Sequence, residues 1–371
     1  MNDTRMDAQG IQAAVEQAGA TWQAGVTPLT QLSQEERLMH LGAVPPGGEA
    51  SLHEREQMAA AKRGMLMAAA VGYPAAYDLT NVGGNNFITS VKDQGGCGSC
   101  VAFGTCATVE GTARKLNNNP ALVIDLSEAQ LFYCYAEVQD GRNCDNNANS
   151  GWWPDPALNY FKTGGVADEA CYPYTAGDQA CTNLCADWAS RATKITGWHT
   201  IADPAAMKTW ISTVGPLSTC FTVYDDFFAY KTGIYHHVTG GVAGGHCVSV
   251  VGYDDAQGFW KCKNSWNAGW GDAGFFKIAY GQCGIDATMW AVEGVVLPAV
   301  WLTNKLITGL WTTDQDLNAW VYVSTIGWRK IAWDTPNIFF DMLAQLSAAK
   351  DRARPVNLLV DNGVIKQIYV F

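Results

Sequence analysis

Residues 94–100 read QGGCGSC and lead directly into an apolar segment. From Cys100 to about Leu116 apolar residues recur at helical spacing without a proline, which predicts a buried helix that begins at Cys100. A sulfur at a helix N-terminus lies among free N–H groups at the positive end of the helix dipole, and both favour the thiolate. Cys100 is therefore the candidate nucleophile.

A thiolate nucleophile needs a partner that holds its proton and later protonates the leaving amine, and histidine has a suitable pKa. The stretches 246–253 and 258–264 are rich in strand-forming residues and are separated by an Asp-Asp turn, which predicts a hairpin. His246 begins the first strand, and Asn264 follows the second. The Asn264 amide would orient the imidazole and Trp266 would keep water off that hydrogen bond, as in a catalytic triad.

These motifs resemble the papain and cathepsin family of cysteine proteases, in which a Cys-Gly-Ser-Cys stretch carries the nucleophile. The resemblance covers residues 75–295, where several blocks follow the family's order. It implies an α+β, papain-like two-domain fold: a helical domain supplies Cys100, and a β-barrel-like domain supplies His246 and Asn264. It also implies hydrolysis of a protein or peptide substrate through an acyl-enzyme, with no cofactor and no metal.

The resemblance assigns further site residues by position. Gln94 matches the side-chain donor of the oxyanion hole, whose second donor is the backbone N–H of Cys100. The place of the family's Gly-Gly strand, where substrate backbone pairs with Gly151, is taken by residues 150–152. Val101 departs from the family, which usually has Trp there, and this loosens packing near the site. The candidate substrate-binding residues are Gly151, Ser150, Trp152, Gly245 and Trp266.

Twelve cysteines, many of them in loop-like sequence, predict disulfides and a secreted or other oxidising extracytoplasmic location. No secretory signal is visible in residues 1–10, which lack a basic segment followed by an apolar one. The resemblance leaves Cys283 without its usual partner. The pairings that it implies are Cys97 with Cys144, and Cys134 with either Cys171 or Cys181.

Charge and hydropathy exclude two classes of partner. The net charge is -11 and no basic cluster stands out, which argues against nucleic acid. No stretch of 18 or more apolar residues occurs, so no membrane span is predicted.

Residues 1–72 contain no cysteine and read as a helical arm broken by a linker. Ser33 with Glu36, and Ser51 with Glu54, are capping boxes that predict short helices. The stretch 42–48 between them is rich in glycine and proline and predicts an extended linker or turn. The arm is interpreted as a propeptide that inhibits the cleft; the alternative is a disordered extension.

The peptidase body is assigned to residues 73–300 and a small C-terminal α+β module to residues 301–371. Residues 319–331 alternate apolar and polar side chains, and Thr335-Pro336 predicts a helix to about Lys350. Asp361-Asn362-Gly363 then predicts a hairpin turn. Binding of a partner, inhibition of the cleft and stabilisation all remain open as roles for this module.

The sequence thus predicts a cysteine endopeptidase that is made as a zymogen. Endopeptidase action is the default because no occluding-loop insertion is visible. Two alternatives remain: a catalytically weak papain-fold protein that binds peptides, motivated by Val101 and the two appendages, and a transpeptidase that passes the acyl group to an amine.

Ser127 is expected to begin a further helix. Its hydroxyl would cap the first turn, and Gln130 would act as the reciprocal partner in the capping box.

Overall fold

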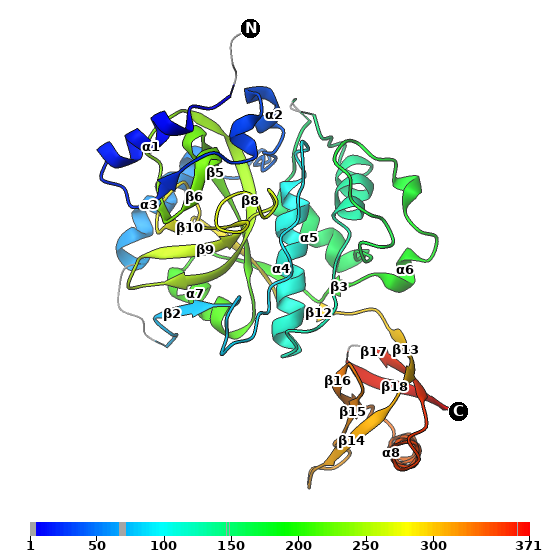
Figure 1. The fold of residues 1–371 in the computed structure, drawn as a ribbon. Helices are drawn as coiled ribbons and strands as arrows, with labels where there is room; N and C mark the ends of the chain where they lie inside the picture. Colours follow the sequence, from blue (N-terminus) through cyan, green and yellow to red (C-terminus); the bar gives the residue numbers. More distant parts are fainter. Residues whose placement is uncertain (1–4, 67–71, 146, 148, 362) are drawn as a thin grey trace. The chain divides into compact units, whose positions relative to one another are not determined.

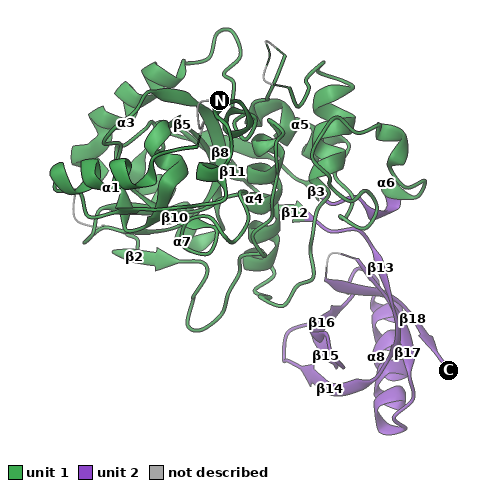
Figure 2. Cartoon of the chain, turned by 45° about the horizontal axis from the view of Figure 1, so that its top comes forward, with its two compact units in different colours: residues 1–189, 194–295 green, residues 190–193, 296–371 purple. Residues whose placement is uncertain are grey.

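The computed structural model describes residues 5–66, 72–145, 147, 149–361 and 363–371 (Figure 1). The chain forms two compact units, one of residues 1–189 with 194–295 and one of residues 190–193 with 296–371 (Figure 2). The expected boundary after residue 72 lies inside unit 1. The expected boundary after residue 300 lies inside strand β13 (Val300–Lys305).

The predicted helix that begins at the candidate nucleophile is α4 (Cys100–Leu116). It runs between the sheet of unit 1 on one side and α5 (Pro154–Thr163) on the other (Figure 1). Glycines allow this close packing: a Cβ on Gly104 would lie 2.9 Å from the sulfur of Cys247, and one on Gly111 would lie 2.7 Å from Pro216. The sequence therefore buries this helix on both sides and fixes its N-terminus.

The main sheet of unit 1 has eight strands in the order β4-β11-β5-β8-β9-β10-β7, with β2 also paired to β8. β8 and β9 pair as antiparallel neighbours, which confirms the predicted hairpin. The strands are β2 (Ala76–Asp78), β4 (Trp198–Ile201), β5 (Leu217–Tyr224), β7 (Ile234–Tyr235), β8 (Val242–Asp254), β9 (Phe259–Lys263), β10 (Phe275–Ala279) and β11 (Met289–Val292).

The remaining elements of the body connect these two parts. The Ser127 hydroxyl accepts from the N–H of Gln130 at 2.9 Å, as predicted for a cap. The prediction of a reciprocal bond from Gln130 is wrong, because the buried Gln130 side chain accepts instead from the N–H of Ala167 at 2.7 Å. The elements that connect the helix α4 to the main sheet and the strands to one another are the π-helical segment η2 (Gln130–Glu137), η3 (Cys181–Asn183), α6 (Trp188–Arg191), β3 (Lys194–Ile195), α7 (Pro204–Thr213), η4 (Asp225–Ala229), β6 (Tyr230–Thr232) and β12 (Val295–Val296).

Three disulfides cross-link residues 97–185. Cys97 pairs with Cys144, as expected, and Cys134 takes Cys181 from its two expected partners. Cys171 pairs with Cys185, a bond that was not predicted. The buried cysteines without a disulfide are Cys100, Cys106, Cys220, Cys247, Cys262 and Cys283.

The N-terminal arm is folded against the body of unit 1. Both predicted capping boxes form: Ser33 and Glu36 bond reciprocally, and so do Ser51 and Glu54. Trp22 is 1% exposed and contacts the ring of Tyr235 with centroids 5.2 Å apart. The disordered-extension alternative is therefore wrong for the described residues. The arm contains α1 (Ala8–Gln17), β1 (Gln23–Ala24), η1 (Leu29–Gln31), α2 (Gln34–Leu38) and α3 (Leu52–Leu66), with β1 paired to β6.

Unit 2 is a six-stranded sheet in the order β13-β17-β18-β16-β15-β14, covered by one helix (Figure 2). Its own core includes Val321, Leu346 and Leu358. The predicted pairing of residues 356–360 with 364–371 is confirmed, while Asn362 lies outside the described residues. The further elements are β14 (Ile307–Thr312), β15 (Ala319–Val323), β16 (Gly327–Ile331), α8 (Pro336–Asp351), β17 (Val356–Asp361) and β18 (Val364–Val370).

In the parts of the chain that the structure describes, every helix is too short or too polar to cross a bilayer.

Candidate active site

Cys100 lies at the first position of α4, where the sequence places it, but its thiol is covered. The residue is 0% exposed. Burial raises the pKa of the Cys100 thiol, and the neighbouring Cys247 thiol adds to the rise. The backbone N–H groups of Cys247, Gly42 and Val101 oppose it. Because burial outweighs these donors, the sulfur is protonated in this form, whereas the helix terminus alone predicts a thiolate.

His246 and Asn264 are brought together as the hairpin predicts. Asn264 Oδ1 lies 2.7 Å from His246 Nε2 and also accepts from the N–H of Ser265 at 2.8 Å. This oxygen is an acceptor in both bonds, so Nε2 carries the proton and Nδ1 holds the free lone pair. Nδ1 has no hydrogen-bond partner among the described residues. The ring of Trp266 shields the pair, with its centroid 4.6 Å from that of His246.

Gln94 is buried beside this pair and is held on both sides of its amide. Its Oε1 accepts from the Ser265 hydroxyl at 2.6 Å, and its Nε2 donates to the backbone oxygen of Cys97 at 2.8 Å. The same Nε2 lies 3.1 Å from the carbonyl oxygen of His40, in the arm. An arm carbonyl thus binds the group that was expected to bind a substrate oxyanion.

The arm leaves the turn at His40 and crosses the site with residues 41–44. Gly42 and Ala43 both donate to the carbonyl oxygen of Gly245 at 3.0 Å. On the other side, Trp152 donates to Gly42 O at 2.7 Å and accepts from the N–H of Val44 at 3.0 Å, in a parallel bridge. Two expected substrate-binding residues, Gly245 and Trp152, therefore bind the backbone of the arm.

Three glycines make room for this segment. A Cβ on Gly42 would lie 1.9 Å from the carbonyl oxygen of Gly98. A Cβ on Gly151 would lie 2.3 Å from Gly42 O, and one on Gly245 would lie 2.0 Å from Ala43 O. Gly151 also has φ +72°, which favours glycine. The cleft walls and the arm approach each other at backbone distance.

The last expected substrate-binding residue, Ser150, faces another segment. It forms a parallel bridge with Asn143 in the structure. Sequence reasoning also missed two residues at the site: Gly42 begins the stretch 42–48, which was interpreted only as a linker, and His40 lies just before that stretch. The glycine content of that stretch was the one signal available.

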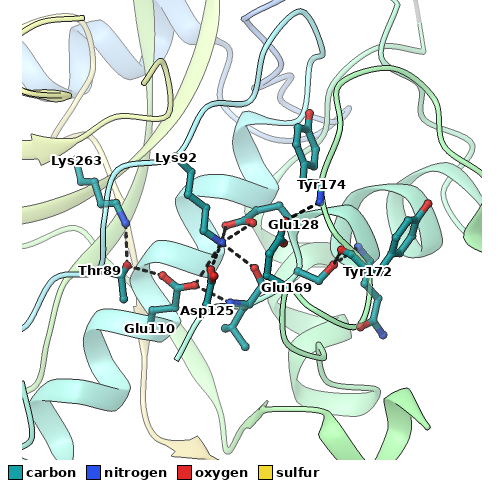
Figure 3. Close-up of polar contacts among 12 residues, drawn as sticks. Thr89, Lys92, Glu110, Asp125, Glu128, Glu169, Tyr172, Tyr174 and Lys263 are labelled. Carbon is teal, nitrogen blue, oxygen red and sulfur yellow. Dashed lines mark hydrogen bonds and ion pairs between the residues drawn. The ribbon is translucent and has the colours of Figure 1, made fainter. Parts of the chain in front are cut away.

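Lys92 forms ion pairs with three carboxylates, of which two are buried and one, that of Asp125, is exposed (Figure 3). Lys92 Nζ lies 2.7 Å from Glu128 Oε2, 2.6 Å from Asp125 Oδ1 and 3.7 Å from Glu110 Oε1. Burial alone would lower the pKa of Lys92, but the charges of Glu128 and Glu110 outweigh it and the pKa rises. Burial in turn raises the pKa of Glu128 against the pull of Lys92.

This network reaches the residue before Asn264. Lys263 donates to the Thr89 hydroxyl at 2.8 Å, and Thr89 donates to Glu110. Lys92, Glu128, Lys263, Asn264 and Ser265 line one internal cavity of about 10 Å³. The charges of the network thus support the strand end that carries the orienting amide.

Replacing Lys92 with methionine is expected to lower the free energy of unfolding by about 3 to 5 kcal/mol, because buried Glu110 and Glu128 lose their cation. Urea denaturation of the full chain measures this. The control is Lys261→Met, which removes the ion pair with the more exposed Asp78 and is expected to cost about 1 kcal/mol or less. An equal decrease in the free energy of unfolding in the two variants would contradict a special role for the ion pairs of Lys92.

The arm is expected to bind less tightly over the site at acid pH. Burial lowers the pKa of His246 to about 3 and lowers that of His40 in the arm. Neutral imidazoles are thus favoured while the arm is seated, whereas an open cleft leaves a histidine near its ordinary pKa of about 6.5. The seated form therefore loses stability as pH falls below about 6.5, by about tenfold per pH unit for His246 until its pKa of about 3 is reached, and the lowered pKa of His40 acts in the same direction.

Hydrogen exchange of residues 40–44 between pH 7 and 4, in a Cys100→Ala chain that cannot cleave itself, measures this loss. Corrected protection that stays constant over that range would contradict it.

Comparisons with known proteins place these features in context. The sequence model of papain family cysteine proteases matches residues 73–292. Two Giardia intestinalis proteins, cathepsin B-like CP3 and CP2, are 39% and 37% identical to this chain, covering 54% and 55% of it and 68% and 69% of their own lengths. Cathepsin B of Dictyostelium discoideum is 33% identical over 222 residues, 54% of this chain and 67% of its own.

Solved structures show the same fold. Procathepsin B S9 from Trypanosoma congolense matches with a TM-score of 0.61 at 22% identity and covers 78% of this chain and 98% of its own. Digestive procathepsin L2 from the larval midgut of Tenebrio molitor matches with a TM-score of 0.58 at 25% identity and covers 77% and 88%.

Proposed function

This chain belongs to the papain family of cysteine proteases, and we propose that it is the zymogen of an endopeptidase in which Cys100 is the nucleophile. It is a cysteine peptidase with the α+β papain-like fold. In the proposed mechanism His246 carries the proton, Asn264 orients the His246 ring, and Gln94 stabilises the oxyanion. The observation that carries the proposal is the arm carbonyl of His40, bound to Gln94 beside the covered Cys100.

Catalysis begins when the arm leaves and a substrate carbonyl takes the place of His40 O. The Cys100 proton passes to His246 Nδ1, the free lone pair of the ring, and the sulfur attacks the carbonyl carbon. Gln94 Nε2 and the N–H of Cys100 stabilise the negative oxygen. The C–N bond then breaks, His246 protonates the leaving amine, and water activated by His246 releases the acyl group from sulfur.

The arm acts in this proposal as an inhibitory propeptide, residues 1–72, ahead of a peptidase body of residues 73–300 and a module of residues 301–371. Its backbone fills the narrow gap between Gly151 and Gly245, so substrate is excluded while it is seated. Zymogens among the structural neighbours support this assignment. The three disulfides support maturation in an oxidising, extracytoplasmic or lysosomal compartment.

Intact mass after treatment with an epoxide that alkylates activated thiolates tests the function. The folded full chain is compared with the same chain cut at a protease site engineered after Gly72. We expect one adduct only after the cut, absent in Cys100→Ala, together with cleavage of a casein substrate into peptides. Absence of both labelling and cleavage would contradict the protease function and favour the alternative, a papain-fold protein that binds peptides.

The same reaction separates hydrolysis from acyl transfer. A protease adds one water molecule to the cleaved bond. We therefore expect the product masses to be the same with and without an added amine acceptor. Products that carry the amine would instead identify a transpeptidase.

A further inference from the structure

Cys220 and Cys247 are a pair of free thiols that the proposed mechanism does not use. Cys220 on β5 and Cys247 on β8 lie directly opposite each other in the antiparallel register. Both are 0% exposed and outside the three disulfides. Opposite residues of such strands have Cα atoms about 4.5 or 5.5 Å apart and side chains on one face, and a disulfide spans about 4.4 to 6.8 Å. The sheet therefore holds the two cysteines at a separation that a disulfide bridges.

The two thiols also contact each other. Burial raises the pKa of Cys220, and its hydrogen bond with the Cys247 thiol adds to the rise. The Ser218 hydroxyl, two residues before Cys220 on the same strand, lies 3.6 Å from Cys247 Sγ. The Cys247 side chain is thus turned toward β5, as a bridge to Cys220 requires.

Cys247 lies between Cys220 and the candidate nucleophile. On α4, Gly104 follows Cys100 by one helical turn, so the two residues share one face of the helix. A Cβ on Gly104 would lie 2.9 Å from Cys247 Sγ. The backbone N–H of Cys247 donates to the Cys100 sulfur, which opposes the rise of the Cys100 pKa. Three free thiols therefore follow one another from the nucleophile into the sheet.

The arm covers all three thiols. Cys100 is 0% exposed beneath residues 41–44, and Arg55 Nη2, on α3, donates to the backbone oxygen of Cys220 at 3.3 Å. In the processed protein the proposed function requires Cys100 to be open to substrate. A thiolate that is open to a peptide is also open to small-molecule disulfides.

We propose that Cys247 and Cys220 are a resolving pair, which frees Cys100 after a low-molecular-weight disulfide such as oxidised glutathione has blocked it. The inference rests on the proposed function, since it needs Cys100 as an exposed thiolate in the processed protein. It assigns to the processed protein a further bridge, Cys220–Cys247, that the zymogen lacks.

Three thiol–disulfide exchanges complete the reaction. The Cys100 thiolate attacks oxidised glutathione, which forms a mixed disulfide and releases one glutathione thiolate. Cys247 then attacks the Cys100 sulfur, and its proton leaves with the second glutathione as a thiol. Finally Cys220 attacks the Cys247 sulfur, Cys100 departs as a thiolate, and the proton of Cys220 neutralises the first glutathione thiolate.

The net change is a two-electron oxidation of the pair. Cys220 and Cys247 lose two electrons and two protons, one glutathione disulfide becomes two thiols, and Cys100 returns unchanged. The last two steps are intramolecular, and the sheet holds the final partners side by side. They are therefore favoured over renewed attack by free glutathione.

The test uses the chain folded in full length, cut at the site engineered after Gly72 and separated from the arm. Epoxide labelling counts the active fraction before and after incubation with oxidised glutathione. A second sample is blocked with a maleimide in denaturant and mapped by peptide mass. The parent is expected to keep its labelling within about twofold and to show one peptide pair linked through Cys220 and Cys247, with no glutathione on Cys100.

Two variants stop the reaction at different steps. Cys247→Ala is expected to leave glutathione on Cys100 and to lose at least about tenfold of its labelling. Cys220→Ala is expected to lose as much labelling, but with Cys100 bridged to Cys247 and no glutathione attached. The matched control is Cys262→Ala, which removes a buried free thiol from β9, opposite Val250, and is expected to behave as the parent.

The outcomes separate the two proposals. A parent enzyme that is labelled before the oxidant, but forms no Cys220–Cys247 bridge with it, overturns the resolving pair and leaves the protease intact. Labelling of oxidised Cys247→Ala at the parent level also overturns it. A chain that is neither labelled nor able to cleave any peptide before the oxidant overturns the proposed function, and the resolving pair with it.

Discussion

Replacing Cys100 with alanine is expected to lower kcat/KM for peptide hydrolysis by at least about 10⁵-fold, because the acyl-enzyme cannot form without the sulfur. The remaining groups, His246 and Gln94, can still polarise a bound peptide but have no nucleophile to direct. The measurement is hydrolysis of a fluorogenic peptide by the processed protein, normalised to total folded protein.

Cys106→Ala is the matched control. Cys106 is also buried, free of disulfides and on α4, but it lies further along the helix than the nucleophile. It is expected to keep kcat/KM within about threefold and to lose some stability, as small buried truncations do. Equal loss of activity in both variants would mean that damage to the helix, and not removal of the nucleophile, explains the result.

Gly42→Val is expected to open the zymogen without any cleavage. Its Cβ would lie 1.9 Å from the carbonyl oxygen of Gly98, a backbone atom, and no side-chain rotation can move a Cβ away. Overpacking of this kind costs about 1 to 3 kcal/mol, so epoxide labelling of Cys100 in the uncut chain should rise by about 10- to 100-fold.

The control for this change is Gly47→Ala, further along the same arm, where an added Cβ meets no atom within 4 Å. Its labelling rate is expected to match that of the parent chain. Labelling of Gly42→Val at the parent rate would show that the segment 40–44 does not limit access to Cys100.

Local sequence signals predicted the parts of the site that local structure builds. The helix at Cys100 and the hairpin that pairs His246 with Asn264 depend on spacing within one or two elements, so the sequence contains what is needed. The carbonyl of His40 at Gln94 joins residues more than fifty positions apart. Nothing in residues 40–48 except glycine content indicates which surface they would cover.

Side-chain chemistry was harder to predict where burial competes with a local effect. A helix N-terminus favours a thiolate at Cys100, yet burial of the residue raises the thiol pKa against the N–H groups around it. Gln130 shows the same limit on a smaller scale, because its amide is taken by Ala167 from another segment. In both cases the tertiary environment, and not the local sequence, determines the outcome: the protonation state of Cys100 and the hydrogen-bond partner of Gln130.

The three disulfides limit the damage when one copy of a protease cleaves another. Their loops overlap, since Cys97–Cys144, Cys134–Cys181 and Cys171–Cys185 each begin before the previous one ends. Any single cut between residues 97 and 185 is therefore spanned by at least one bridge and releases no fragment. Tolerance of self-digestion is thus built into that half of the body, whereas none of the three bridges reaches the strands that carry His246 and Asn264.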